Sequence, residues 1–122
     1  MGAWGTGPFD NDIAADWVLE VEASDDPRTA VVDAFESALA PDGLDDGSAD
    51  MAYGAAAWVA TDGDAEDGAP NVRAPALDPV VRDLATRSLQ RMSADGSPWL
   101  ELWDDPDEVV QKVSQIIRRL AR

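Results

Sequence analysis

The sequence contains neither histidine nor cysteine among its 122 residues. Histidine is the commonest general base and metal ligand, so its absence excludes Ser-His-Asp, Cys-His and His-metal mechanisms. The absence of cysteine excludes disulfides, thiolate metal sites and thiol nucleophiles, and it is compatible with a reducing cytoplasm. The common routes to catalysis and to transition-metal binding are therefore closed to this chain.

Basic residues are scarce and unevenly placed. Nine Lys and Arg stand against 25 Asp and Glu, which gives a formal net charge of −16. Residues 1–67 hold 17 of the acids and a single base, Arg28, whereas residues 68–122 hold eight acids and eight bases. Phosphate recognition needs a basic face, so nucleic acid is an unsuitable partner and a basic protein is a suitable one. The alternative interpretation of the charge is general solubility in a salty cytoplasm.

Long apolar runs are also missing. No uninterrupted run approaches the roughly 18 residues of a membrane span, and no basic region precedes an apolar stretch near the first residue. We therefore expect a cytoplasmic protein that does not enter membranes. A chain of 122 residues suits one domain that buries about two-thirds of its unfolded surface, as a monomer or a homodimer.

Helix signals are abundant. Asp-Pro pairs at residues 26–27, 78–79 and 105–106 each combine an N-cap side chain with proline at the first helical position. Apolar residues follow each pair at spacings of three and four, and Asp10 or Asn11 is the expected cap of an earlier helix whose apolar face would include Ile13. Residues 51–60 are apolar nearly all round, which predicts a buried central helix.

No segment alternates as a half-buried strand does, so the sequence predicts an all-α, single-domain bundle of five or six short helices over residues 1–122. The expected core groups are large and apolar: Trp4, Phe9, Trp17, Phe35, Trp58, Trp103 and Ile116. Residues 61–76 are rich in Gly, Pro and acids, and we expect a mobile acidic loop there. Its Asp62–Gly68 stretch departs from the EF-hand pattern, so we predict no metal site.

The first seventeen residues carry a distinctive motif. The chain opens with MGAWGTGPFDND and passes directly into a helical pattern. It resembles a bacterial family known as domain of unknown function 4259 in these residues: Met1, Gly2, Trp4, Gly5, Gly7, Phe9, Asp10, Asn11, Asp12 and Trp17. Weaker similarities occur at residues 52–60 and 97–103. The resemblance implies a shared fold and no particular activity, since the family has none established.

The WGTGPF loop at residues 4–9 permits two interpretations. Trp4 and Phe9 could be exposed anchors for a partner, because aromatic residues dominate interface hot spots. They could instead pin the Gly/Pro-rich loop onto the helices, and this is the interpretation that we favour. Asp12, Asp16 and Glu20 fall at i, i+4 and i+8, which predicts one acidic helix face that is either simply solvated or awaits a basic partner.

No nucleophile elbow or phosphate-binding loop is present, and we predict no catalytic residue, no metal and no cofactor. The leading hypothesis is a non-enzymatic protein-interaction module with an acidic N-terminal half. In its concrete form, it is an inhibitor or immunity-type protein that covers a basic site. Its partner-binding candidates are Trp4, Phe9, Asp12, Asp16 and Glu20. The alternative is a small ligand-binding protein or a hydrolase that uses a pair of carboxylates.

Overall fold

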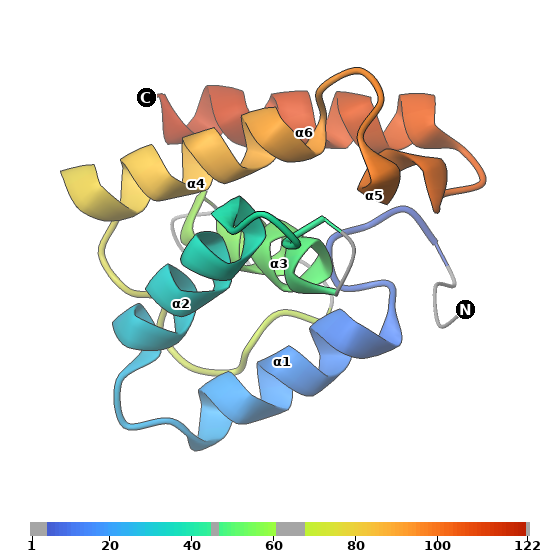
Figure 1. Ribbon diagram of the computed structural model, residues 1–122. Coiled ribbons are helices and arrows are strands. Elements are labelled where there is room, and N and C mark those ends of the chain that lie inside the picture. The colour runs from blue at the N-terminus through green and yellow to red at the C-terminus, as the bar shows by residue number, and fades with distance from the viewer. Residues whose placement is uncertain (1–4, 45–46, 61–67, 122) are drawn as a thin grey trace.

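The computed structural model describes residues 5–44, 47–60 and 68–121. These residues form a helical bundle without strands, as the sequence predicts (Figure 1). The six helices of the described part are α1 (Asp12–Ala23), α2 (Pro27–Leu39), α3 (Ser48–Ala60), α4 (Pro79–Met92), α5 (Pro98–Glu101) and α6 (Pro106–Leu120).

The predicted helix starts are confirmed at the level of single atoms. Asp26, Asp78 and Asp105 each accept a hydrogen bond from the backbone N–H three residues later, at 3.3, 2.9 and 3.2 Å. Asn11 caps α1, with its Oδ1 accepting from Ala14 N at 2.8 Å. Asp10 instead closes the preceding turn, where its carboxylate accepts from Gly7 N at 3.0 Å. Side-chain capping by acids and amides therefore sets the start of four of the helices.

Helix α3 is the centre of the bundle. Ten of its thirteen residues are buried, and it contacts α1, α2, α4 and α6. Its many alanines let the neighbouring helices approach closely, because interhelical distance depends on side-chain size. Around it, α4 and α6 run side by side along one edge, α2 lies in front, and α1 lies along the opposite edge (Figure 1). The predicted buried central helix is confirmed, although it begins three residues earlier, at Ser48.

The expected core is largely observed. Phe9, Trp17, Phe35, Trp58, Trp103 and Ile116 are all at most 8% exposed. Trp4 lies outside the described residues, as does the stretch 61–67 with which the expected mobile loop begins. Ile13 was expected on the apolar face of α1, but it is 42% exposed. It lies at the edge of that face, against the start of α3 at Gly47.

Phe9 packs against two glycines that are distant in the sequence. A Cβ on Gly54 would come within 3.0 Å of the Phe9 ring, and one on Gly68 would come within 2.9 Å of the Phe9 Cβ. Gly68 also has a φ of +91°, which residues with side chains rarely adopt. The Tyr53 hydroxyl donates to Thr6 O at 2.7 Å and joins the same loop to α3. Glycine in the middle of α3 thus makes room for the ring of Phe9.

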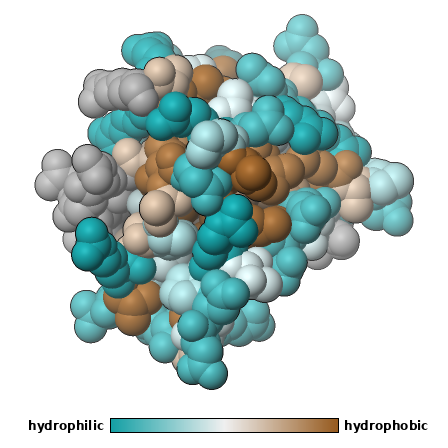
Figure 2. Space-filling model, turned by 90° about the vertical axis from the view of Figure 1, so that its left-hand side faces the viewer, coloured by the Kyte–Doolittle hydropathy of each residue, from teal (hydrophilic) through white to brown (hydrophobic). Residues whose placement is uncertain are grey.

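The surface at one end of the bundle is partly apolar. Figure 2 views the end where α2 and α4 begin and α6 finishes, and hydrophobic side chains gather in the middle of that face with hydrophilic ones around them. Val80, the second residue of α4, is 54% exposed. The Arg28–Asp78 ion pair, 3.0 Å long, joins the starts of α2 and α4.

Candidate functional site

An open groove runs between α1 and α2. The short connection at Ser24–Asp26 places the two helices next to one another, and their facing side chains leave a hollow of about 420 Å³. Helix α1 contributes Trp17 and Glu20, and its C-cap residue Ser24 follows Glu20 by four positions on the same side. Helix α2 contributes Thr29, Ala30, Asp33, Ala34 and Ser37, and Asp26 and Met51 complete the lining.

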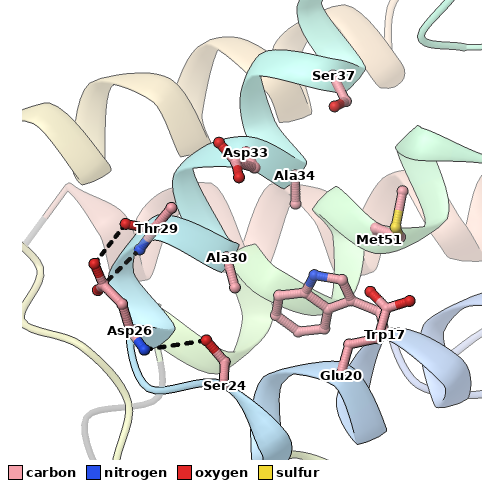
Figure 3. Close-up of a pocket in the computed structure, with 10 residues that line it drawn as sticks. All are labelled: Trp17, Glu20, Ser24, Asp26, Thr29, Ala30, Asp33, Ala34, Ser37 and Met51. Carbon is pink, nitrogen blue, oxygen red and sulfur yellow. Dashed lines mark hydrogen bonds between the residues drawn. The ribbon is translucent and has the colours of Figure 1, made fainter.

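The floor of the groove is apolar. Trp17 extends from α1 toward Ala30 on α2, with Ala34 and Met51 nearby (Figure 3). The Trp17 ring is 4% exposed and packs edge to face on Trp58 of α3, with ring centroids 6.1 Å apart. Such packing fixes the orientation of the indole. Trp17 and Ala34 are therefore almost fully covered, whereas Ala30 and Met51 are half-buried and form the accessible part of the floor.

One end of the groove is closed by a network of hydrogen bonds. Asp26 accepts from the Thr29 hydroxyl at 2.6 Å and from Thr29 N at 3.3 Å, and its own N–H donates to Ser24 Oγ at 3.1 Å. The bonds from Thr29 hold the pKa of Asp26 below its ordinary value, because they stabilise the carboxylate. Asp26 thus stays charged while it caps α2.

The other acids of the groove have no such partners. Glu20 and Asp33 are exposed, and neither makes an ion pair or a side-chain hydrogen bond with the described part of the chain. The described residues contain two ion pairs, Arg28–Asp78 and Arg87–Asp83, and no acid of α1 or α2 takes part in either. The carboxylates on the two walls of the groove are therefore available to an external cation.

The structure separates the predicted site residues. Asp12, Asp16 and Glu20 are exposed on α1, as a surface role requires, but only Glu20 lines the groove. Phe9 is 5% exposed and packs inward, so its ring belongs to the core. Trp4 lies outside the described residues. Of the predicted site residues that the structure describes, the three acids of α1 therefore lie on the surface and Phe9 lies in the core.

A second cluster of polar and aromatic groups lies where α5 meets α3. Trp99 Nε1 donates to Asp50 Oδ1 at 2.9 Å, and the rings of Tyr53, Trp99 and Trp103 meet edge to face, with centroids 5.4 to 6.1 Å apart. Burial raises the pKa of Asp50 above its ordinary value, while the bond from Trp99 acts in the opposite direction. Trp99 is 1% exposed. This cluster holds α5 in place and does not line the groove.

A family model for Domain of unknown function (DUF4259) matches residues 2–115. The chain belongs to this family. The family resemblance carried by the N-terminal motif is thus confirmed, and the match extends through most of α6. Neither the curated proteins nor the solved structures gave a significant match. Membership of DUF4259 thus identifies the family and leaves its chemistry to be argued from the site.

Other kinds of site find little support in the described residues of this DUF4259 chain. They contain no group of three or more acids placed to hold a metal ion. Asp62–Gly68, the calcium-like stretch, lies outside them except for Gly68. None of the helices in the described ranges is long and apolar enough to cross a membrane. The α1–α2 groove is therefore the candidate site of this chain.

Sequence reasoning missed the α2 half of the groove. Asp33 and Ser37 are four residues apart, and Thr29 precedes Asp33 by four, so all three lie on one face of α2. This spacing can be read from the sequence and indicates a polar face on α2. The position of this face opposite Glu20 depends on the angle between two helices, which the sequence pattern does not specify.

Proposed function

We propose that this protein is a non-enzymatic interaction module that binds a basic protein through the acidic surface of α1 and α2. The observation that carries the proposal is the absence of internal counter-ions for the acids of these helices in the described part of the chain. Negative charge concentrated on one side speeds the encounter with a positive partner by electrostatic steering. The concrete form is a cytoplasmic inhibitor or immunity-type protein that covers a basic active site.

The location of the charge supports this proposal. Asp12, Asp16 and Glu20 form an exposed row at helical spacing on α1, and Asp33 adds a carboxylate across the groove. Like charges at i, i+4 repel by a few tenths of a kcal/mol per pair, so the row does not stabilise α1. A basic partner would convert this repulsion into attraction.

The carboxylate-pair hydrolase has less support. It would need two acids with separated pKa values in one cleft. Asp50, the described acid whose pKa burial raises, is bonded to Trp99 and does not line the groove. Glu20 and Asp33 are exposed on either side of an open hollow. We therefore propose no reaction.

The test is affinity capture of basic proteins at low and at moderately high salt. The native protein is compared with a triple reversal, Asp12→Lys, Asp16→Lys and Glu20→Lys. The matched control reverses three exposed acids outside the site, Asp95→Lys, Glu101→Lys and Asp104→Lys. Each reversal changes the charge by two, so both variants carry a formal charge of −10 in place of −16.

We expect the native protein and the control to retain a basic protein at low salt and to release it at high salt. The α1 reversal should fail to retain it, with an unchanged helical circular dichroism spectrum. Equal capture by both reversals would show that α1 is not the binding surface. Light scattering of the native protein would also reveal a homodimer, for which the apolar end in Figure 2 provides a surface.

A further inference from the structure

Helices α2 and α4 lie side by side and begin at the same end of the bundle (Figure 1). Near their starts, Arg28 Nε donates to Asp78 Oδ2 at 3.0 Å. Near their ends, Arg91 Nη1 donates to Ala38 O at 2.7 Å. The two helices are therefore parallel, and polar contacts hold them together at both ends.

An apolar strip follows the surface between these two helices. On α4, Val80 and Leu84 are four residues apart and lie on the same side as Arg91, which reaches over to α2. On α2, Val32 follows Arg28 by four positions, so it lies on the side that faces α4. Val80 is 54% exposed, and Val32 and Leu84 are half-buried. We call these three residues the α2–α4 strip, and Figure 2 shows that hydrophobic side chains gather at this end of the bundle.

The charges of the two helices are balanced, although the chain as a whole is strongly acidic. Residues 27–39 and 78–92 contain four acids and four bases, whereas α1 contains four acids and no base. A basic partner is attracted more strongly to α1, and an acidic partner is repelled by the net charge of −16. A second copy of the chain carries the same net charge, so it meets the least repulsion at a balanced surface. The charge distribution therefore favours a second copy as the occupant of the α2–α4 strip.

We propose that two copies of this chain form a two-fold symmetric dimer in which their α2–α4 strips cover one another. A two-fold interface places the same patch on both sides. A patch with an apolar centre and charges of both signs around it is complementary to itself, because acids of one copy can face bases of the other. Helix α1 lies along the opposite edge of the bundle (Figure 1), so the dimer leaves both acidic rows exposed. This inference does not depend on the proposed function.

Sedimentation velocity over a range of protein concentrations, at low and at high salt, measures the dimer directly. Each copy carries a formal charge of −16, and salt screens the repulsion between the copies. We therefore expect Kd of the dimer to decrease at least fivefold from low to high salt, whereas salt should release a basic partner. A native protein that stays monomeric at every concentration and at both salts would overturn the proposal. A dimer that salt weakens would overturn the balanced interface.

Two matched variants test the position of the interface. Val80→Ser changes the α2–α4 strip and Leu102→Ser changes the region after α5, and both side chains are 54% exposed in the native protein. Neither substitution changes the formal charge, and the helical circular dichroism spectrum should stay the same in both. We expect Val80→Ser to raise Kd of the dimer at least tenfold, or about 1.4 kcal/mol, because both copies lose an apolar group. Leu102→Ser should change it less than twofold, and equal weakening by both would refute the α2–α4 interface.

The same variant separates this inference from the proposed function. If Val80→Ser weakens the dimer and leaves capture of a basic protein unchanged, the dimer stands on its own and α1 is still the binding surface to be tested. If Val80→Ser leaves the dimer intact and reduces capture, the α2–α4 strip belongs to another protein and the dimer proposal is wrong.

Discussion

The hydrogen bond between Asp50 and Trp99 is expected to stabilise the packing of α5 on α3. The contribution of Asp50 to the stability of the fold should depend on pH. The bond is 2.9 Å long, Trp99 is 1% exposed, and burial raises the pKa of Asp50 above its ordinary value of 3.8. Asp50→Ala removes the acceptor and leaves the indole N–H unpaired, which costs about 1–3 kcal/mol. For a chain of this length, 1 kcal/mol corresponds to about 4 °C in Tm, so we expect a loss of about 4–12 °C.

Asp50→Asn is the matched control, because it keeps an oxygen that can accept from Trp99 and removes the charge. The substitution removes the favourable interaction of an acid with the first turn of α3, which is worth about 0.3–1 kcal/mol. It also removes the penalty for burying part of a charge, and this change stabilises the fold. We therefore expect Asp50→Asn to be clearly more stable at pH 7 than Asp50→Ala.

The pH dependence of folding stability tests whether burial disfavours the charged form of Asp50. Because the pKa of Asp50 is higher in the folded chain than in the unfolded chain, the folded state binds this proton more tightly. Asp50 therefore makes its full contribution to stability below pH 3.8, its ordinary pKa. This contribution decreases as the pH rises through the raised pKa of Asp50 in the folded chain. Urea denaturation between pH 3 and 7 should show that the free energy of unfolding of Asp50→Asn increases relative to that of the native protein as the pH rises. A constant difference would refute the burial argument, and an unchanged Tm in Asp50→Ala would refute the structural role of the bond.

Three further perturbations test separate parts of the structure. Phe9→Ala should cost about 3–5 kcal/mol in urea denaturation, because it empties the space beside Gly54 in the core. Arg91→Met should cost about 1–2 kcal/mol, because the carbonyls at the end of α2 lose their donor. Asp16→Lys should raise stability by about 1 kcal/mol, since two repulsive i, i+4 pairs become attractive. The same change should weaken capture of a basic protein. Unchanged capture would indicate that the acidic row of α1 is simply solvated and binds no partner.

The helices could be predicted from local sequence because their signals are local. An Asp-Pro pair fixes a cap and a first turn within four residues, and the predicted bonds at Asp26, Asp78 and Asp105 are all observed. The central position of α3 followed from its apolar composition, since a helix that is apolar all round needs partners on every side.

Features that join distant segments could not be predicted in the same way. The contact between Phe9 and Gly54 spans 45 positions, and its sequence signal is a single glycine inside an alanine-rich helix. Asp50 and Trp99 are 49 positions apart in the sequence, and only the fold brings the two side chains together. The groove combines Glu20 with Asp33, which belong to separate periodic patterns. Helix periodicity gives each face, and helix packing decides which faces meet.

The position of the acids explains why stability and recognition can be separated in this domain. The apolar face of α1 packs inward through Trp17 and Val21, whereas Asp12, Asp16 and Glu20 lie on the exposed side and pair with no described base. Their mutual repulsion costs little, because water and salt screen exposed charges within about 8–10 Å. The same screening sets the range over which a basic partner would be attracted. An acidic row that folding does not require can therefore be changed without unfolding the domain, so that the effect on capture of a basic protein can be measured.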